Sequence, residues 1–204
     1  MSTLLLILDG FGHTSTQQGN AIAQASTPTL DRFNTVYPNS VIDASGHAVG
    51  LPDKQPGNSE VGHLHLGAGR IVPQSLLRIN QLLDSGALNN HLKLKHIIRH
   101  IRETHTTLHL MGLLSSGGVH SHEKHLWALI ELLKAADCPT QLHLFLDGRD
   151  TPPQSALSSI QTAQACIQDT EHIKLATLSG RFWAMDRDHR WDRTAQCYTA
   201  LTDP

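Results

Sequence analysis

The stretch TLHLMGL, residues 107–113, decides the fold class, because it is predicted to be a strand and has helical patterns on both sides. The pattern before it covers residues 92–104, and the one after it covers residues 121–136. In the second pattern the apolar residues recur at i, i+3, i+4 and i+7, as Leu126, Leu129, Ile130 and Leu133. Strands and helices that alternate in this way predict an α/β fold with a mainly parallel sheet and helices on both of its faces.

Two further strands of this sheet are predicted at residues 141–146 and 173–178. The helix between them is expected to open at Thr151-Pro152-Pro153, because proline fits the first turn of a helix. Another helix is expected near the C-terminus. The second half of the chain therefore continues the same alternation of strand and helix.

The first half of the chain is less regular. LLLIL, residues 4–8, is predicted to be a strand buried on both faces, and it is too short and lacks the flanks for a membrane span or signal peptide. Residues 28–33 are predicted to form a short helix and residues 40–44 a second strand. Residues 46–69 are rich in glycine, proline and polar side chains, which indicates a long functional loop with a helical turn.

Composition narrows the class of protein. With 204 residues, a net charge of −2 and a pI of about 6.7, the chain offers no electrostatic basis for binding nucleic acid or a membrane surface. Its cysteines, Cys138, Cys166 and Cys197, are odd in number and widely spaced, which fits neither a disulfide framework nor a zinc site. A reducing cytoplasm is therefore the expected location.

Polar segments follow the three predicted strands of the second half. In open α/β sheets, ligands bind beyond the carboxyl ends of the strands, so these segments are expected to share one binding site. Arginine binds phosphate and carboxylate through two parallel hydrogen bonds, which points to a small substrate with several negative charges. The candidate substrate-binding residues are His120, Arg149, Asp150, Arg181 and Arg187. Of these, His120 and Asp150 are suited to proton transfer.

Two alternatives apply to this group. The arginines could instead form structural ion pairs with the neighbouring aspartates Asp147, Asp186 and Asp188. The histidines His120, His122 and His125 could form a metal site, but no second cluster of cysteines or carboxylates accompanies them. Substrate contact by His120, with the other two on a helix surface, is the favoured interpretation.

In GNSEVGH, residues 57–63, the residues around Ser59 are ones that neither packing in a core nor exposure to solvent would require. The flanking glycines suggest close approach of the backbone, and amides at a helix start favour an anion there. Ser59 is thus a candidate nucleophile, although an alcohol needs a base or a metal to activate it. Asp9 and Ser59 together offer two hard oxygens to a divalent ion, one fewer than a catalytic site usually takes from the protein.

These residues lie within a longer series of motifs that resembles the cofactor-independent (2,3-bisphosphoglycerate-independent) phosphoglycerate mutase family. The resemblance extends over essentially the whole sequence. It rests on LDGFG at 8–12, NAI at 20–22, TP at 27–28, ASG at 44–46, VGLP at 49–52, GNSEVGH at 57–63, GAGR at 67–70, GGVHSH at 117–122, FLDGRDTPP at 145–153, AMDRD at 184–188 and RWDR at 190–193. The chain departs from the family at several positions: Gly and Met are usual at Lys54 and Pro56, Asn at His65, Asp at Ser116, and Tyr-Tyr at Phe182-Trp183.

The resemblance implies an alkaline phosphatase-like α/β core, two manganese ions and interconversion of 3-phosphoglycerate and 2-phosphoglycerate in glycolysis and gluconeogenesis. Ser59 would carry the phosphoryl group as a phosphoserine and would bind one manganese ion together with Asp9. Asp150 would exchange a proton with the substrate hydroxyl. His120, Arg149, Asp150, Arg181 and Arg187 would bind the substrate.

Family members are more than twice as long as this chain, so the resemblance implies an N-terminal portion. Residues 1–72 would be the first segment of a discontinuous metal-binding phosphatase domain, and residues 73–204 an incomplete inserted substrate-binding (transferase) domain. The remaining metal ligands would then be absent, and the isolated chain is expected to be inactive unless a complementary C-terminal chain joins it. A metal-dependent phosphomonoester hydrolase and a non-catalytic remnant are the alternative functions.

Overall fold

The computed structural model describes residues 2–203, which divide into two compact units between Leu77 and Arg78. We call them unit 1 and unit 2, in chain order. The domain boundary predicted between residues 72 and 73 stays a prediction.

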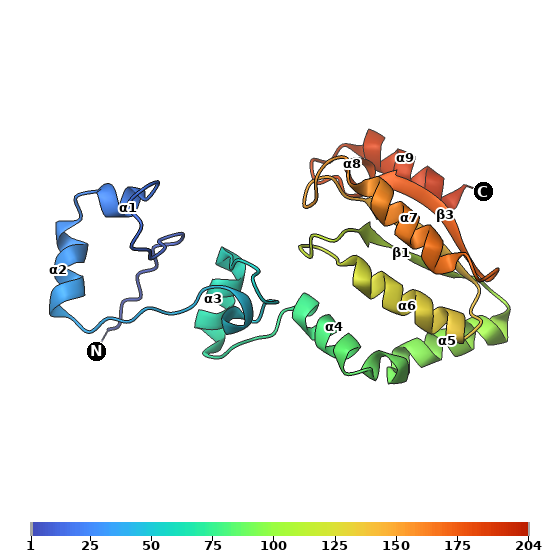
Figure 1. The fold of residues 1–204 in the computed structure, drawn as a ribbon, viewed down its shortest axis with the longest axis horizontal. Coiled ribbons are helices and arrows are strands. Elements are labelled where there is room, and N and C mark those ends of the chain that lie inside the picture. Colours follow the sequence, from blue (N-terminus) through green and yellow to red (C-terminus); the bar gives the residue numbers. More distant parts are fainter. Residues whose placement is uncertain (1, 204) are drawn as a thin grey trace. The chain divides into compact units, whose positions relative to one another are not determined.

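Unit 2 contains the predicted parallel sheet (Figure 1). Its strands are β1 (Leu108–Leu114), β2 (Thr140–Leu146) and β3 (Ile173–Gly180), in the order β1-β2-β3. Both pairings are parallel, and β2 and β3 shift register by one residue between Leu142 and His143. The three strands predicted from the sequence are thus confirmed to within a few residues at each end.

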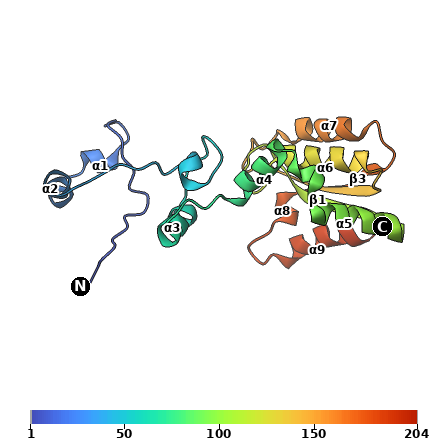
Figure 2. The same ribbon diagram turned by 90° about the horizontal axis from the view of Figure 1, so that it is seen from below.

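Helices cover both faces of this sheet, as predicted. Figure 2 shows α6 and α7 on one side of the strands and α5, α8 and α9 on the other. The helix α4 (Ser75–Asp84) spans the division between the two units. The helices of unit 2 that follow it are α5 (Leu92–Thr104), α6 (Glu123–Ala135), α7 (Ala156–Ile167), α8 (Arg181–Ala184) and α9 (Trp191–Thr202), with a short 3-10 helix η2 (Ala87–Asn90).

The core of unit 2 forms because one face of each helix is apolar. Ile130 and Leu133, from the predicted apolar face of α6, pack with Leu142 and Leu144 of β2 and with Ala163 of α7. Ile130 and Leu142 are completely buried. Burying a side chain of this size stabilises the fold by about 1.5–3 kcal/mol, so these contacts fix α6 and α7 against the sheet.

The start of α7 differs from the prediction. The helix begins at Ala156 and not at the prolines, because the amide of Ser155 donates a hydrogen bond to the carbonyl of Pro152 and closes a turn before the helix. Pro152 and Pro153 therefore shape the loop that carries Asp150. They do not form the first helical turn.

A row of polar side chains crosses the opposite face of the sheet. His109 Nδ1 of β1 lies 2.9 Å from His143 Nε2 of β2, and His143 Nδ1 lies 2.9 Å from Thr177 Oγ1 of β3. The register shift places Thr177 beside His143 and skips Ala176. The His143 imidazole is buried, so it depends on these two partners for its hydrogen bonds.

This row predicts how stability depends on pH. Burial, and then the nearby His109, lower the pKa of His143, so folding favours the neutral ring. The resulting stability is present above the unfolded pKa of about 6.5 and is lost as the pH falls below it. We expect the free energy of unfolding to drop below pH 6.5 by up to about 1.4 kcal/mol per pH unit, and His143→Gln to flatten that slope. Urea titrations between pH 7.5 and 5.5 measure it, and parallel curves for the two proteins would contradict the assignment.

Unit 1 contains the helices α1 (Ala21–Gln24), α2 (Pro28–Val36) and α3 (Ser59–Ala68) and a 3-10 helix η1 (Gly46–Val49). The predicted helix at residues 28–33 is therefore confirmed and is three residues longer. A small core forms where Val49, Leu51 and Val61 pack together. This core joins η1 to α3, which begins at the predicted nucleophile.

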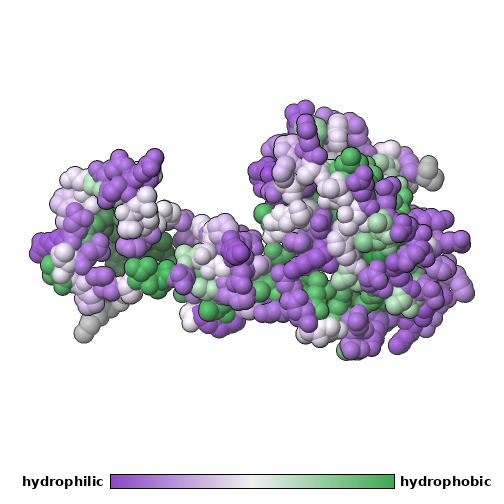
Figure 3. All heavy atoms as spheres, viewed as in Figure 1, coloured by the Kyte–Doolittle hydropathy of each residue, from purple (hydrophilic) through white to green (hydrophobic). Residues whose placement is uncertain are grey.

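The two strands predicted in unit 1 are wrong. Residues 4–8 and 40–44 form no strand, and apart from an isolated bridge between Ser45 and Pro56 no β pairing occurs in the described part of this unit. A strand needs a neighbour to receive its backbone hydrogen bonds, and none is present within residues 2–77. Leu4 is 88% exposed and Ile42 78% exposed. Figure 3 shows green, hydrophobic patches on the surface of this unit.

Over residues 2–203, no helix combines the length and the apolar character that crossing a membrane would require.

Candidate active site

A cavity of about 520 Å³ lies where β2 and β3 end in unit 2. Four of the predicted substrate-binding residues line it, namely His120, Arg149, Arg181 and Arg187. Arg149 follows β2 after a two-residue turn, and Arg181 directly follows β3 as the first residue of α8. The parallel sheet thus brings together side chains that are up to 67 positions apart in the sequence, from His120 to Arg187.

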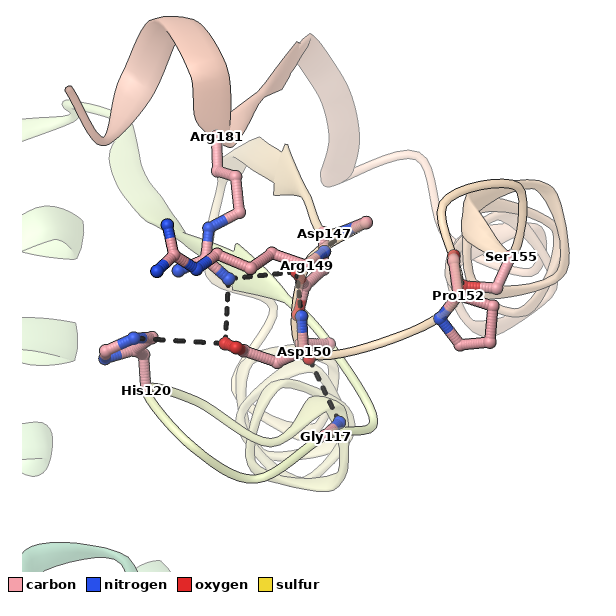
Figure 4. A network of polar contacts seen from close by, with 10 residues as sticks. Gly117, His120, Asp147, Arg149, Asp150, Pro152, Ser155 and Arg181 are labelled. Carbon is pink, nitrogen blue, oxygen red and sulfur yellow. Dashed lines mark hydrogen bonds and ion pairs between the residues drawn. The ribbon is translucent and has the colours of Figure 1, made fainter.

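Asp150, the fifth predicted residue, contacts two members of this group. Its Oδ2 accepts a hydrogen bond from Arg181 Nη1 at 2.7 Å and lies 3.9 Å from His120 Nε2. Figure 4 shows Arg181 and His120 reaching Asp150 from different directions. A carboxylate held between a cation and an imidazole can accept a proton or return one, and the proton-transfer role of Asp150 stays a prediction.

The ion-pair alternative holds for one of the three arginines. Arg181 Nη1 also contacts Asp147 Oδ1 at 2.9 Å, so Arg181 has a structural partner as well as a place in the cavity. Among the described residues, the side chains of Arg149 and Arg187 form no ion pair. These two guanidinium groups are therefore available to an anion.

Sequence reasoning missed Arg193 as a member of the cavity. Its guanidinium carbon lies 3.9 Å above the ring of Phe182, and its Nη1 lies 3.5 Å from Asp186 Oδ1. All three residues line the cavity. The RWDR motif at residues 190–193 contained the signal, but spacing alone did not assign a role to either of its arginines.

Sequence reasoning also missed Asp147, apart from its possible pairing with an arginine. Its side chain is only 2% exposed and accepts hydrogen bonds from Ser115 and from the amides of residues 148–150. Burial would raise the pKa of Asp147, but the Ser115 hydroxyl and these amides outweigh it and hold that pKa far below its usual value. Asp147 therefore carries a fixed negative charge in the wall of the cavity.

In unit 1, Ser59 and Asp9 lie together. Ser59 Oγ donates a hydrogen bond to Asp9 Oδ2 at 2.6 Å, and His63 Nδ1 lies 3.4 Å from the same hydroxyl. Ser59 is the first residue of α3, and the side chain of Asn58 caps this helix by accepting from the amide of Val61. The helix start predicted at the serine is therefore present.

The loop before Ser59 has a tightly constrained backbone. A Cβ on Gly57 would lie 1.8 Å from the carbonyl oxygen of Ala44, so only glycine fits there, whereas a Cβ on Gly62 would meet nothing within 4 Å. The close approach predicted from the flanking glycines thus applies to one of them. Lys54 has a φ of 63°, in the left-handed region that favours glycine, and it is one of the positions where the chain departs from the family it resembles.

The donor set in unit 1 suits a metal ion in kind but not in number. Asp9 and Ser59 provide hard oxygens of the type that manganese prefers. Within residues 2–203, however, no group of three or more His, Cys, Asp or Glu side chains is arranged to hold an ion. Asp9 and Ser59 alone therefore do not form a metal site.

The histidines after β1 do not form a metal site either. His122 Nδ1 accepts a hydrogen bond from the amide of Lys124 and caps α6, while His125 Nε2 lies 2.8 Å from Asn80 Oδ1. Burial lowers the pKa of both rings. His122 and His125 therefore have structural partners, and His120 alone lines the cavity.

Comparison with known proteins shows the family of the chain. A family model described as "BPG-independent PGAM N-terminus" matches residues 79–204. The 2,3-bisphosphoglycerate-independent phosphoglycerate mutase of Prochlorococcus marinus is 48% identical over 202 residues, covering 98% of this chain and 37% of that protein. The Listeria monocytogenes protein of the same name is 48% identical over 200 residues, covering 98% and 39%. A Leishmania mexicana phosphoglycerate mutase, solved at low cobalt concentration, matches with a TM-score of 0.72 and 32% identity over 95% of this chain and 37% of that chain.

The chain thus spans about two fifths of the length of the curated relatives it matches. The matched region covers more than half of the chain, and the motifs that suggested the resemblance lie across both units. The chain belongs to the 2,3-bisphosphoglycerate-independent phosphoglycerate mutase family and corresponds to its N-terminal portion.

Proposed function

We propose that the complete protein interconverts 3-phosphoglycerate and 2-phosphoglycerate, and that unit 2 of this chain binds the substrate. The observation that carries the proposal is the cavity at the strand ends, where three arginines meet His120 and Asp150. Phosphoglycerate carries a phosphate and a carboxylate, and both are groups that arginine binds bidentately. A hydrolase needs to hold only the phosphate, so several arginines favour an enzyme that retains the glycerate.

Each residue has a proposed role. Ser59 Oγ attacks the phosphorus of the substrate, and the bond between that phosphorus and the substrate oxygen breaks. The phosphoryl group then stays on Ser59 until another oxygen of the substrate accepts it. Asp150 holds the proton exchanged with the substrate hydroxyl, and His120 is within ion-pair distance of that carboxylate. Arg149, Arg181 and Arg187 bind the anionic groups, a role that the charges of the phosphate and carboxylate support.

The proposed site would include two manganese ions. Asp9 and Ser59 would each supply one oxygen to one of these ions. An ion held there would supply Lewis-acid chemistry to the Ser59 hydroxyl, which an alcohol needs before it can act as a nucleophile. The other ligands would come from polypeptide outside these 204 residues or from a complementary chain, because the donors described here are too few. We therefore expect the isolated chain to be inactive as a mutase and to work in the cytoplasm only with that remainder.

Titration calorimetry on the 204-residue chain tests the substrate-binding part of this proposal. We expect 3-phosphoglycerate to bind at least about tenfold more tightly than glycerol 3-phosphate or D-glycerate, because each of these lacks one anionic group. Inorganic phosphate is the matched control for a bare anion site. Equal binding of all four compounds would contradict the proposal, and stronger binding of phosphate alone would favour the hydrolase alternative.

A further inference from the structure

The carboxylate of Asp147 contacts the segments that follow all three strands of the sheet. Its Oδ2 accepts a hydrogen bond from Ser115 Oγ, just after β1, at 2.6 Å. Its Oδ1 accepts from the amides of residues 148–150, just after β2, at 2.7, 2.9 and 3.1 Å. The same Oδ1 accepts from Arg181 Nη1, just after β3, at 2.9 Å. One side chain therefore joins the parts of the cavity that come from different strands.

These contacts leave Asp147 no free capacity for chemistry. Its side chain is 2% exposed, and Ser115 is also buried. A carboxylate has about four acceptor sites, and five donors already point at this one. Asp147 is therefore not placed to accept a proton from a substrate, unlike Asp150.

Asp147 holds one edge of the Arg181 guanidinium. The Nη1 of Arg181 is shared between Asp147 and Asp150, at 2.9 and 2.7 Å (Figure 4). The other N–H groups of Arg181 form no hydrogen bond within residues 2–203, and the residue lines the cavity. One edge of the guanidinium is thus fixed by carboxylates, and the remainder is left for a ligand.

We propose that Asp147, held by Ser115, is a positioning residue: it fixes the orientation of Arg181 and the backbone of residues 148–150, so that Arg181 presents its remaining N–H groups to an anionic group of the substrate. The identity of that substrate rests on the proposed function, but the fixed orientation of Arg181 does not. The fixed charge of Asp147 also keeps Arg181 in place while Asp150 gains or loses a proton. Asp150 alone could not do this, because its attraction for the guanidinium disappears when it is protonated.

The test uses the 204-residue chain with ¹⁵N-labelled arginine. In the wild type we expect slow rotation of the Arg181 guanidinium, seen as separate Nη signals in NMR spectra without ligand. Asp147→Asn removes the charge but keeps the shape, so it should speed that rotation and weaken 3-phosphoglycerate binding about tenfold. Asp137→Asn is the matched control, because that carboxylate is 77% exposed and does not line the cavity. It should change neither measurement.

Ser115→Ala is a milder second variant in case Asp147→Asn does not fold. It removes one of the five donors and should give an intermediate rotation rate for Arg181 and about threefold weaker binding. Identical Arg181 signals in the wild type and in the folded variants would overturn the positioning role. A wild type that fails to bind 3-phosphoglycerate would contradict the proposed function instead, and the NMR result would still decide the role of Asp147.

Discussion

Replacing Arg181 by methionine is expected to abolish measurable 3-phosphoglycerate binding and to destabilise unit 2 by about 3 kcal/mol. The substitution removes the ion pairs with Asp147 and Asp150 and leaves the Asp147 carboxylate buried without a cation. Removing one partner of a buried pair typically costs about 3–5 kcal/mol, and we place this case at the lower end because Ser115 and three amides still solvate Asp147. Urea denaturation and titration calorimetry on the same preparations measure the two effects.

A matched control and a double variant test the reason for this effect. Arg99→Met makes the same chemical change on the exposed side of α5 and should alter stability by less than about 0.5 kcal/mol. Adding Asp147→Asn to Arg181→Met removes the unpaired charge and should recover part of the lost stability. If the double variant were less stable than Arg181→Met alone, the unpaired Asp147 charge could not be the cause.

Replacing Ser59 by alanine is expected to eliminate mutase turnover in a reconstituted protein. The chain would be combined with the C-terminal remainder of the Listeria monocytogenes relative, which is 48% identical over the shared part. Loss of an essential nucleophile lowers turnover by roughly 10⁴-fold or more, because no other group takes over the covalent step. An assay coupled to enolase measures turnover, and mass spectrometry measures phosphate on residues 57–63.

Ser85→Ala is the control for this variant. Ser85 is an exposed serine whose hydroxyl donates only to the carbonyl of Leu82, so its loss should leave turnover unchanged. Turnover by Ser59→Ala at the level of Ser85→Ala would rule out Ser59 as the nucleophile. Phosphate found on another serine of the wild type would do the same.

The fold of unit 2 could be predicted from the sequence because each strand finds a partner for its backbone hydrogen bonds within the same unit. The boundaries of α5 were predicted to the residue, and each strand of the sheet has its partner close by in the chain. Residues 4–8 have an equally clear strand pattern but form no strand, because within the described chain no neighbouring strand receives their hydrogen bonds. An apolar pattern reports a preference for burial, and it does not report whether a partner is present.

The candidate site could be predicted in part for a similar reason. His120, Arg149, Arg181 and Arg187 follow strands, and the rule for parallel sheets was enough to place them around one cavity. Asp147 was missed as a positioning residue because an aspartate that ends a strand looks the same in sequence whether it binds a ligand or holds its neighbours. Only its burial and its five hydrogen-bond donors separate the two roles.

The exposed apolar run at residues 4–8 makes the polypeptide prone to aggregation and degradation in a cell. Five consecutive apolar residues without charge or proline are a template for pairing with the same segment of another molecule. They are also the kind of surface that chaperones bind and that proteases reach when it stays uncovered. An uncovered run of this kind is therefore expected to lower the abundance of the chain, and pairing with a complementary strand is expected to raise it.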